Sequence, residues 1–501
     1  MLNKGKHIEK RSRGVHVRLT RGAPQLRRQR GAFAVMTAAL ILVMLGFCGL
    51  AIDLGRVYNR KVELQGVADA AALAAAAELD GTAEGIDRAM NAAADSAGRN
   101  YRYNYAASSI EWSNAAVRFS SVPSNGTWLE AGEARTQAQA LFNVEVDTSR
   151  LAEHHGRVDT ALIRVLSAAN ASVHMRGRAV AARTTINVTP LAICAMSNLR
   201  GAARGEELVE HGFRRGISYN LMKLNPNNKN KGANFLVNPV APPGTAGKSL
   251  KSRLDVIRPF VCTGTMAMPR VTGGNITVED DFPFQSVFPQ LNSRFGSYTS
   301  PCTPAGAPPD SNVKEFTVSS TENAITWVTD KPAGQSAAKA TTDTSLLTVA
   351  DLPSDSGTTI TAPMYGPLWI ASRAARYSSY EEGKPEPAPG GYATFNATST
   401  HWAKLYTPGL PKPKGTYPSP VPAKSGSHTI SPTGLTGVAD RRILNIPLLR
   451  CPVSPGSPAQ AEVLAIARFY MTRQASGDDL VAEFTGLARP DALRGQVELH
   501  Q

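Results

Sequence analysis

The amino-acid sequence predicts an α+β protein in which a single N-terminal transmembrane helix is extended into a long stalk helix, followed by a β-rich, loop-rich extracytoplasmic region. Three observations predict this fold class. An uncharged run of 22 residues lies at 31–52, a proline-free run of helix formers continues it to residue 79, and short segments of alternating apolar and polar residues follow. With 42 glycines and 34 prolines in 501 residues, much of the remaining chain must be loop.

The first 30 residues form a basic tail that is expected to lie in the cytoplasm. Ten lysines and arginines stand there against Glu9, so this tail carries +9 of the net charge of +14. A nucleic-acid-binding surface would need a charged body or interleaved aromatic side chains, and the sequence has neither. We therefore expect no nucleic-acid partner.

Residues 31–52, GAFAVMTAALILVMLGFCGLAI, are predicted to be the membrane anchor. As a helix they extend roughly 33 Å, which is enough to cross a bilayer. The basic tail places the N-terminus in the cytoplasm by the positive-inside rule. A single-pass protein of a bacterial inner membrane is expected, with its main domain periplasmic or extracellular. The anchor positions singled out are Gly31, Val35, Leu40, Leu45 and Ile52.

A cleaved signal peptide is the main alternative, because Gly49-Leu50-Ala51 offers small residues at a possible cleavage site. The apolar run is longer than the apolar region of a signal peptide, which usually has 7–15 residues, and the basic region ahead of it is unusually long. Both observations favour a retained anchor. Lipoprotein processing is not expected, because Phe47 precedes Cys48 where a small residue is needed.

Residues 53–100 are predicted to form a helical stalk. Asp80-Gly81 is a plausible C-cap, which gives one helix of roughly 70 Å together with the anchor. A second helix capped by Thr82 would fold back against it. A narrow apolar seam suits either a partner helix or this protein's own outer domain. The seam consists of Leu54, Val57, Leu64, Ala68, Ala71 and Ala75.

The stretch from Arg30 to Glu78 resembles the N-terminal segment of the TadE/TadG-like family, the membrane components of the tight-adherence machinery that assembles Flp-type pili. The match lies in the apolar segment that starts with glycine and in the helix that follows. The matching stalk residues are Asp53, Gly55, Tyr58, Leu64, Gln65, Asp69 and Leu73. The resemblance implies a structural or assembly role in pilus formation and cell adhesion. Its implied partners are pilins or other pilus-assembly proteins, with a homo- or hetero-oligomer formed through the stalk.

Two departures limit what the resemblance implies. Family members processed like pilins carry Glu five residues after the cleaved glycine, whereas Gly31 is followed at that distance by Met36, which argues against such cleavage. Some members carry a von Willebrand A domain whose metal site begins Asp-x-Ser-x-Ser. The closest place here is Asp351-Leu352-Pro353-Ser354, where proline replaces the first serine, so we expect a turn and no metal.

Beyond the stalk we expect a small α+β domain over 101–189 and a β-rich outer domain over 190–490 with a Pro/Gly-rich insertion at about 300–440. Nine prolines fall between Pro385 and Pro422, too many for a packed core. Expected elements are a strand at 140–147, a helix at 160–168, a strand pair at 173–187, a hairpin of 218–224 with 234–237, and C-terminal strands at 442–446, 463–471 and 480–485 that complete the domain begun near Pro190.

Four cysteines lie outside the anchor, and none forms a CxxC pair of the kind that zinc or redox chemistry uses. On the extracytoplasmic side they suggest two disulfides with three possible pairings, or some buried free thiols. A bond from Cys194 to Cys451 would suit closure of the outer domain. The candidates are Cys194, Cys262, Cys302 and Cys451.

No catalytic motif occurs in the chain, so we expect no enzyme, no cofactor and no metal. His154-His155 is interpreted as solvent-facing sequence, because adjacent side chains point in different directions. The alternative to a pilus-assembly component is an extracytoplasmic adhesin or envelope binding module that shares only the anchor.

Overall fold

The computed structural model describes residues 30–500 except 101–109, 125, 167–168, 170, 206, 225–233, 281, 318–333, 343–344, 349–363, 365, 369, 381–428 and 457. The chain divides into two compact units. The first comprises residues up to Arg60 together with Arg157–His174, and the second comprises Lys61–Gly156 together with Met175–Gln501. Each unit is described separately below.

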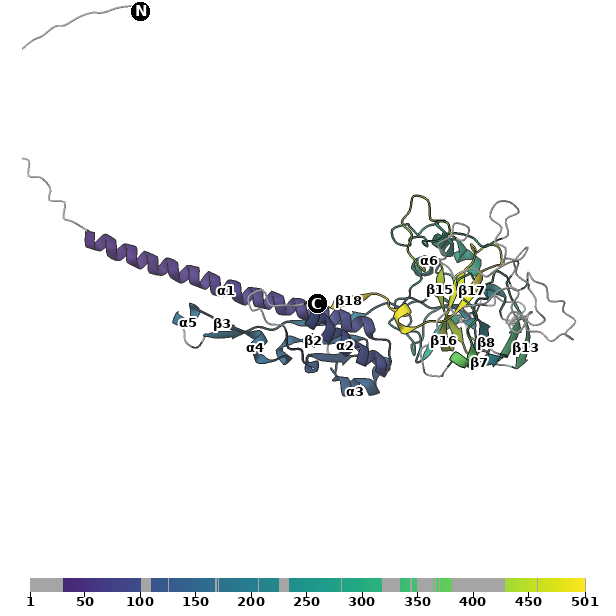
Figure 1. The fold of residues 1–501 in the computed structure, drawn as a ribbon, viewed down its shortest axis with the longest axis horizontal. Helices are drawn as coiled ribbons and strands as arrows, with labels where there is room; N and C mark the ends of the chain where they lie inside the picture. The colour runs from purple at the N-terminus through teal and green to yellow at the C-terminus, as the bar shows by residue number, and fades with distance from the viewer. Residues whose placement is uncertain are drawn as a thin grey trace, which may run out of the picture. The chain divides into compact units, whose positions relative to one another are not determined.

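The first unit is built on helix α1 (Arg30–Glu78), which continues beyond it. The helix forms because its 49 residues contain no proline and are dominated by alanine, leucine and other good helix formers. Strands β3 (Arg157–Asp159) and β4 (Ser172–His174) pair antiparallel, and the short helix α5 (Ile163–Leu166) lies between them in the chain. Figure 1 shows β3 and α5 alongside α1.

In the second unit, the end of α1 and helix α2 (Ala83–Asn100) pack with a four-stranded antiparallel sheet. The sheet order is β1 (Val117–Ser120), β2 (Asn143–Asp147), β5 (Arg178–Arg183) and β18 (Val497–His500). The end of α1 contributes mainly alanines to this core, and their small side chains let the helix backbone approach the sheet closely. Helices α3 (Ala131–Thr136) and α4 (Glu153–Gly156) complete this small α+β domain.

The end of the chain belongs to the small domain. Strand β18 pairs antiparallel with β5, from Val497 opposite Arg183 to His500 opposite Val180. No strand was expected after residue 485, because a segment of only four residues carries little strand signal. The small sheet therefore joins segments more than 300 residues apart.

The outer domain contains a seven-stranded sheet of order β10-β17-β16-β12-β11-β6-β15, with a further pairing of β16 to β15. Strands β16, β12, β11, β6 and β15 thus form a closed ring. The strand bounds are β6 (Leu191–Cys194), β10 (Ser218–Asn220), β11 (Phe235–Val237), β12 (Asn275–Glu279), β15 (Ile443–Leu449), β16 (Ala459–Met471) and β17 (Val481–Leu487).

The outer domain also contains smaller elements. They are a three-stranded sheet, a two-stranded sheet and two helices. Their bounds are β7 (Ala202–Arg204), β8 (Glu207–Glu210), β9 (Phe213–Arg214), β13 (Ala337–Thr342), β14 (Ser345–Thr348), α6 (Leu254–Thr263) and α7 (Phe288–Leu291).

Two disulfides stabilise the outer domain. Of the three pairings left open by the sequence, the structure has Cys194–Cys451 and Cys262–Cys302. The first joins the neighbouring ends of β6 and β15, which are the parallel pair of the ring. Cys48 is a free cysteine exposed on α1.

The α+β class with a long N-terminal helix and a β-rich remainder is confirmed. The pairing of the C-terminal strands with the strand after Pro190 is also present, since β15 lies parallel to β6. Two local predictions are wrong. Residues 173–187 do not form a strand pair, because β4 pairs with β3 and β5 pairs with β2 and β18.

The predicted hairpin of 218–224 with 234–237 is the second error. Strand β10 pairs with β17, while β11 pairs with β6 and β12. Nearness in sequence suggested a hairpin, but long-range partners complete both strands instead. The proline-rich segment 385–422 and the stretch 351–354 lie outside the described residues.

Candidate membrane-proximal site

The N-terminal part of α1 exposes an apolar surface. Val35, Leu40, Leu45 and Ile52 are each more than half exposed, and Gly31 also lies in the helix. Among the described residues, α1 is the one helix long and apolar enough to cross a membrane. Length and composition are the basis of this assignment, and an N-terminal signal sequence meets the same criteria.

Asp53, the first charged residue after this surface, is held by three consecutive backbone N–H groups. Its Oδ1 accepts from Ala161 N–H at 2.9 Å, and its Oδ2 accepts from Leu162 and Ile163 N–H at 2.8 Å each. The side chain is only 1% exposed. The bonds from Ile163 and its two neighbours hold the pKa of this carboxyl below its usual value, against the opposing effect of burial. Both carboxylate oxygens of Asp53 therefore accept backbone hydrogen bonds, which favour its charged form.

One helical turn earlier, Gly49 makes room for the same segment. A Cβ atom at Gly49 would lie 1.8 Å from Cδ1 of Leu162, so any larger residue would displace this side chain. Residues 161–166, called the latch loop below, thus pack on α1 at two points: Leu162 on Gly49, and three N–H groups on Asp53.

A second attachment, within the second unit, involves the next residues of the family pattern. The Gln65 side-chain amide donates to Arg178 O at 2.8 Å, and its carbonyl oxygen accepts from Arg178 N–H at 3.3 Å. Gln65 also donates to Asp69 at 2.7 Å. A Cβ atom at Gly177 would lie 2.2 Å from Leu64 O, so the chain before β5 touches the helix backbone directly.

The seven stalk residues that carry the resemblance therefore have two different surroundings. Asp53, Leu64, Gln65 and Asp69 are engaged in the contacts above, and Leu73 packs partly buried against the small domain's core. Gly55 and Tyr58 remain open.

The open part of the stalk is a short face of α1. A Cβ atom at Gly55 would meet nothing within 4 Å, Tyr58 is 68% exposed, and the neighbouring Leu54 is 54% exposed. We call Leu54, Gly55 and Tyr58 the open face. Leu54 and Tyr58 are four residues apart, so their side chains lie next to each other on one side of the helix.

The apolar seam of α1 was predicted to contact either a partner helix or this protein's own outer domain. The burial of its residues agrees with neither prediction over most of the seam. Leu64, Ala68, Ala71 and Ala75 are completely buried among residues of α2 and the small sheet, such as Phe119 and Val144. A partner helix cannot reach them, so that hypothesis is wrong for this part of the seam. The protein's own residues do cover it, but they belong to the small domain and not to the outer domain.

The prediction that His154-His155 is solvent-facing is wrong for His155, which is 1% exposed. Its Nε2 accepts the backbone N–H of Glu111 at 3.0 Å. One ligand atom from each of Glu111, His154 and His155 lies within 4.8 Å of the others. The backbone bond occupies Nε2 of His155, so this nitrogen is not available to bind a metal ion.

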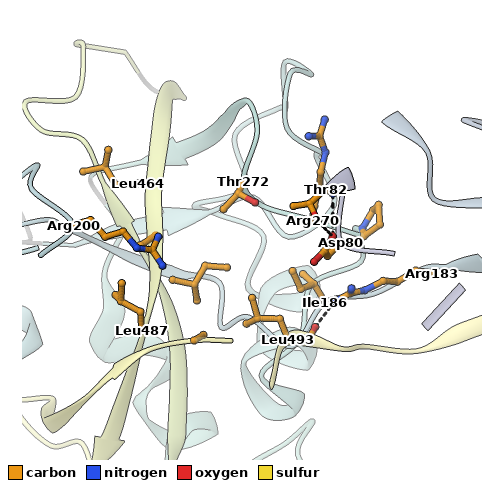
Figure 2. A pocket seen from close by; sticks show the side chains of 14 residues that line it. Asp80, Thr82, Arg183, Ile186, Arg200, Arg270, Thr272, Leu464, Leu487 and Leu493 are labelled. Atoms are coloured by element: carbon orange, nitrogen blue, oxygen red, sulfur yellow. Dashed lines mark hydrogen bonds between the residues drawn. The ribbon is translucent and has the colours of Figure 1, made fainter. Parts of the chain in front are cut away.

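A pocket of about 180 Å³ lies where the end of α1, β5 and the β16–β17 pair meet (Figure 2). Arg183 at its wall donates to Leu79 O at 2.7 Å and to Leu493 O at 2.5 Å, and burial lowers its pKa to about 10. Asp80 is the one carboxylate in the lining and is bonded to Arg88 and Thr82. The lining holds no histidine, cysteine or serine.

Sequence reasoning found Asp53 and Gln65 but missed what they bind. The donors to Asp53 are backbone groups, which leave no residue signature. Gly177 is one of 42 glycines, and its close approach to Leu64 depends on segments more than 100 residues apart.

Comparison with known proteins supports the resemblance of the N-terminal segment. Residues 31–78 match the family described as "Putative Flp pilus-assembly TadE/G-like", so the predicted likeness is confirmed for this segment. No curated protein matches the chain. No solved structure matches it either.

Proposed function

We propose that the protein is a membrane-anchored structural and assembly component of a bacterial tight-adherence (Flp-type) pilus system, and that it is not an enzyme. The match of residues 31–78 to the TadE/G-like family carries this proposal. The protein acts through contacts of its stalk helix and its outer domain with pilins or other assembly proteins.

The proposed location is a bacterial inner membrane, with the N-terminus in the cytoplasm and the domains outside. Support comes from the basic tail before the apolar part of α1, which the positive-inside rule assigns to the cytoplasm. The Cys194–Cys451 and Cys262–Cys302 disulfides agree with an oxidising compartment on the other side.

Retention of the anchor is supported by the packing of Leu162 on Gly49. Cleavage after Ala51 would remove Gly49 and expose this part of the latch loop. A signal peptide that is discarded has no reason to fit a loop of the mature protein. We therefore propose that α1 remains whole.

The open face of Leu54, Gly55 and Tyr58 is the proposed contact with a neighbouring helix. It follows directly after the anchor, carries two large side chains that are more than half exposed, and has a glycine that allows close helix approach.

The first test is a count of surface pili by electron microscopy in a strain that lacks this chain, beside a complemented strain. Loss of pili that complementation restores supports the assembly role. Unchanged pili would contradict it and would favour the adhesin hypothesis.

A second test concerns the open face. Leu54→Glu combined with Tyr58→Glu should abolish pili while the protein accumulates normally, because neither residue is part of the core. Leu199→Glu is the matched control, since Leu199 is 64% exposed in the outer domain. If the stalk variant still makes pili at the normal number, the helix-contact part of the proposal is wrong.

A further inference from the structure

We propose that the latch loop lies in the interfacial layer of the outer leaflet, where Leu162 and Ile163 contact lipid chains and Arg164 contacts lipid phosphate, and that Asp53 holds it there. The proposal rests on the membrane anchoring proposed above. It adds a second lipid-contacting element, more than 100 residues away from the anchor in sequence.

The depth of the loop follows from its contacts with α1. Gly49 lies three residues before Ile52, the last residue of the apolar run, so it is about 4.5 Å further into the span along the helix axis. Leu162 packs directly on Gly49. If the apolar run spans the hydrocarbon, Leu162 must lie at the level where acyl chains meet headgroups.

The composition of the loop suits this depth. Leu162 is 38% exposed although it packs on the helix, Ile163 is partly exposed, and Arg164 is exposed. An arginine beside two apolar residues can place its stem among acyl chains and its guanidinium at the phosphates. On the same face of α1 as Gly49, one turn closer to the N-terminus, Leu45 is 59% exposed, so the loop lies next to apolar helix surface.

Asp53 explains how a loop can be held at this boundary. An unpaired carboxylate next to hydrocarbon is costly, and so are backbone N–H groups without acceptors. Here three N–H groups of the loop satisfy the carboxylate, and the carboxylate satisfies them. Both costs are removed only while the loop stays against α1, so Asp53 is a positioning residue for the loop.

The test measures depth in the full chain, reconstituted in phosphatidylglycerol–phosphatidylethanolamine vesicles. A fluorescent label is attached at Leu162→Cys or Arg164→Cys in a Cys48→Ala background. Arg157→Cys, at the base of the same hairpin and exposed, is the control position. Quenching is compared between lipids spin-labelled near the headgroup and aqueous iodide.

The expected result is several-fold stronger lipid quenching at 162 and 164 than at 157, with the reverse order for iodide. Asp53→Ala should reduce lipid quenching at 164 while the chain still resists carbonate extraction. Equal iodide quenching at 157 and 164, or protection from both quenchers as under a protein partner, would overturn the lipid assignment. Unchanged quenching in Asp53→Ala would overturn the role of Asp53.

The same experiment separates this inference from the proposed anchoring. If carbonate extracts the unmodified chain from the vesicles, the anchor itself is wrong and the loop proposal fails with it. If the chain stays in the membrane but the loop labels are aqueous, only the loop proposal fails.

Discussion

Individual glycines mark where separate parts of the chain come together, and Gly177 gives a direct test. Gly177→Ala would place a Cβ atom 2.2 Å from Leu64 O, a backbone atom that can move only with α1. We expect the free energy of unfolding to fall by about 1–3 kcal/mol, as for other overpacked sites. Urea unfolding of the full chain in detergent, followed by circular dichroism, measures it.

Gly132→Ala is the matched control for this substitution. Gly132 lies in α3 with nothing within 4 Å of its would-be Cβ atom, so alanine should be neutral or stabilise by up to about 1 kcal/mol. Equal effects of the two substitutions would mean that the contact of Gly177 with α1 is not formed.

A buried acid in the outer domain predicts a pH dependence. Glu483 is fully buried, and its carboxylate accepts from the backbone N–H groups of Ile370, Ala371 and Ser372 at 2.6–2.9 Å. Burial raises its pKa from 4.5 to about 7, although these bonds oppose the change. The folded protein therefore keeps this proton to higher pH than the unfolded chain does.

The consequence for stability has a definite sign. The contribution of Glu483 is full below about pH 4.5 and is lost as the pH rises through about 7. The loss is on the order of 3 kcal/mol. Unfolding measured from pH 4.5 to 8 should show this decline in the wild type and a smaller one in Glu483→Gln, which cannot titrate. Parallel curves would contradict the assignment to Glu483.

Among the secondary-structure elements, the closed ring of strands depends on a parallel pair that two cysteines tie together. Cys194–Cys451 closes a loop with a sequence separation of 257, compared with 40 for Cys262–Cys302. Replacing both cysteines of the first pair by alanine should lower the free energy of unfolding by about 2–5 kcal/mol, and by about 1–2 kcal/mol more than replacing the second pair. Urea titrations of both variants measure the difference, and a larger cost for the second pair would contradict this account.

The apolar periodicity of helix α1 predicts some properties of this element but not others. Its length and its alanine-rich seam were evident, because apolar residues at three- and four-residue steps mark one face of any helix. The pattern could not identify the occupant of that face. A partner helix and the small domain both offer apolar side chains, and burial of Leu64 and Ala68 by the small domain excludes the partner there.

For the molecule as a whole, the C-terminal strand connects the end of the chain to the small domain near the stalk. Deleting residues 496–501 removes β18 and uncovers the edge of β5. Backbone N–H groups of β5 that bond to β18 should then exchange faster with solvent, while the ring strands β15 and β16 keep their protection. Hydrogen exchange with mass spectrometry measures both regions in one experiment. Equal loss of protection in the ring would show that the two domains unfold together.

The amino-acid sequence alone determined the long apolar helix, the basic tail, the α+β class and the likeness to TadE/G-like proteins. These features depend on the composition and on the periodicity of single continuous segments, and both can be read directly from the order of residues in the chain. Folding in three dimensions determined that Asp53 binds the latch loop, that Gln65 binds Arg178, and that β10 pairs with β17. Such contacts join residues more than 100 positions apart and often use backbone groups, which are the same in every amino acid.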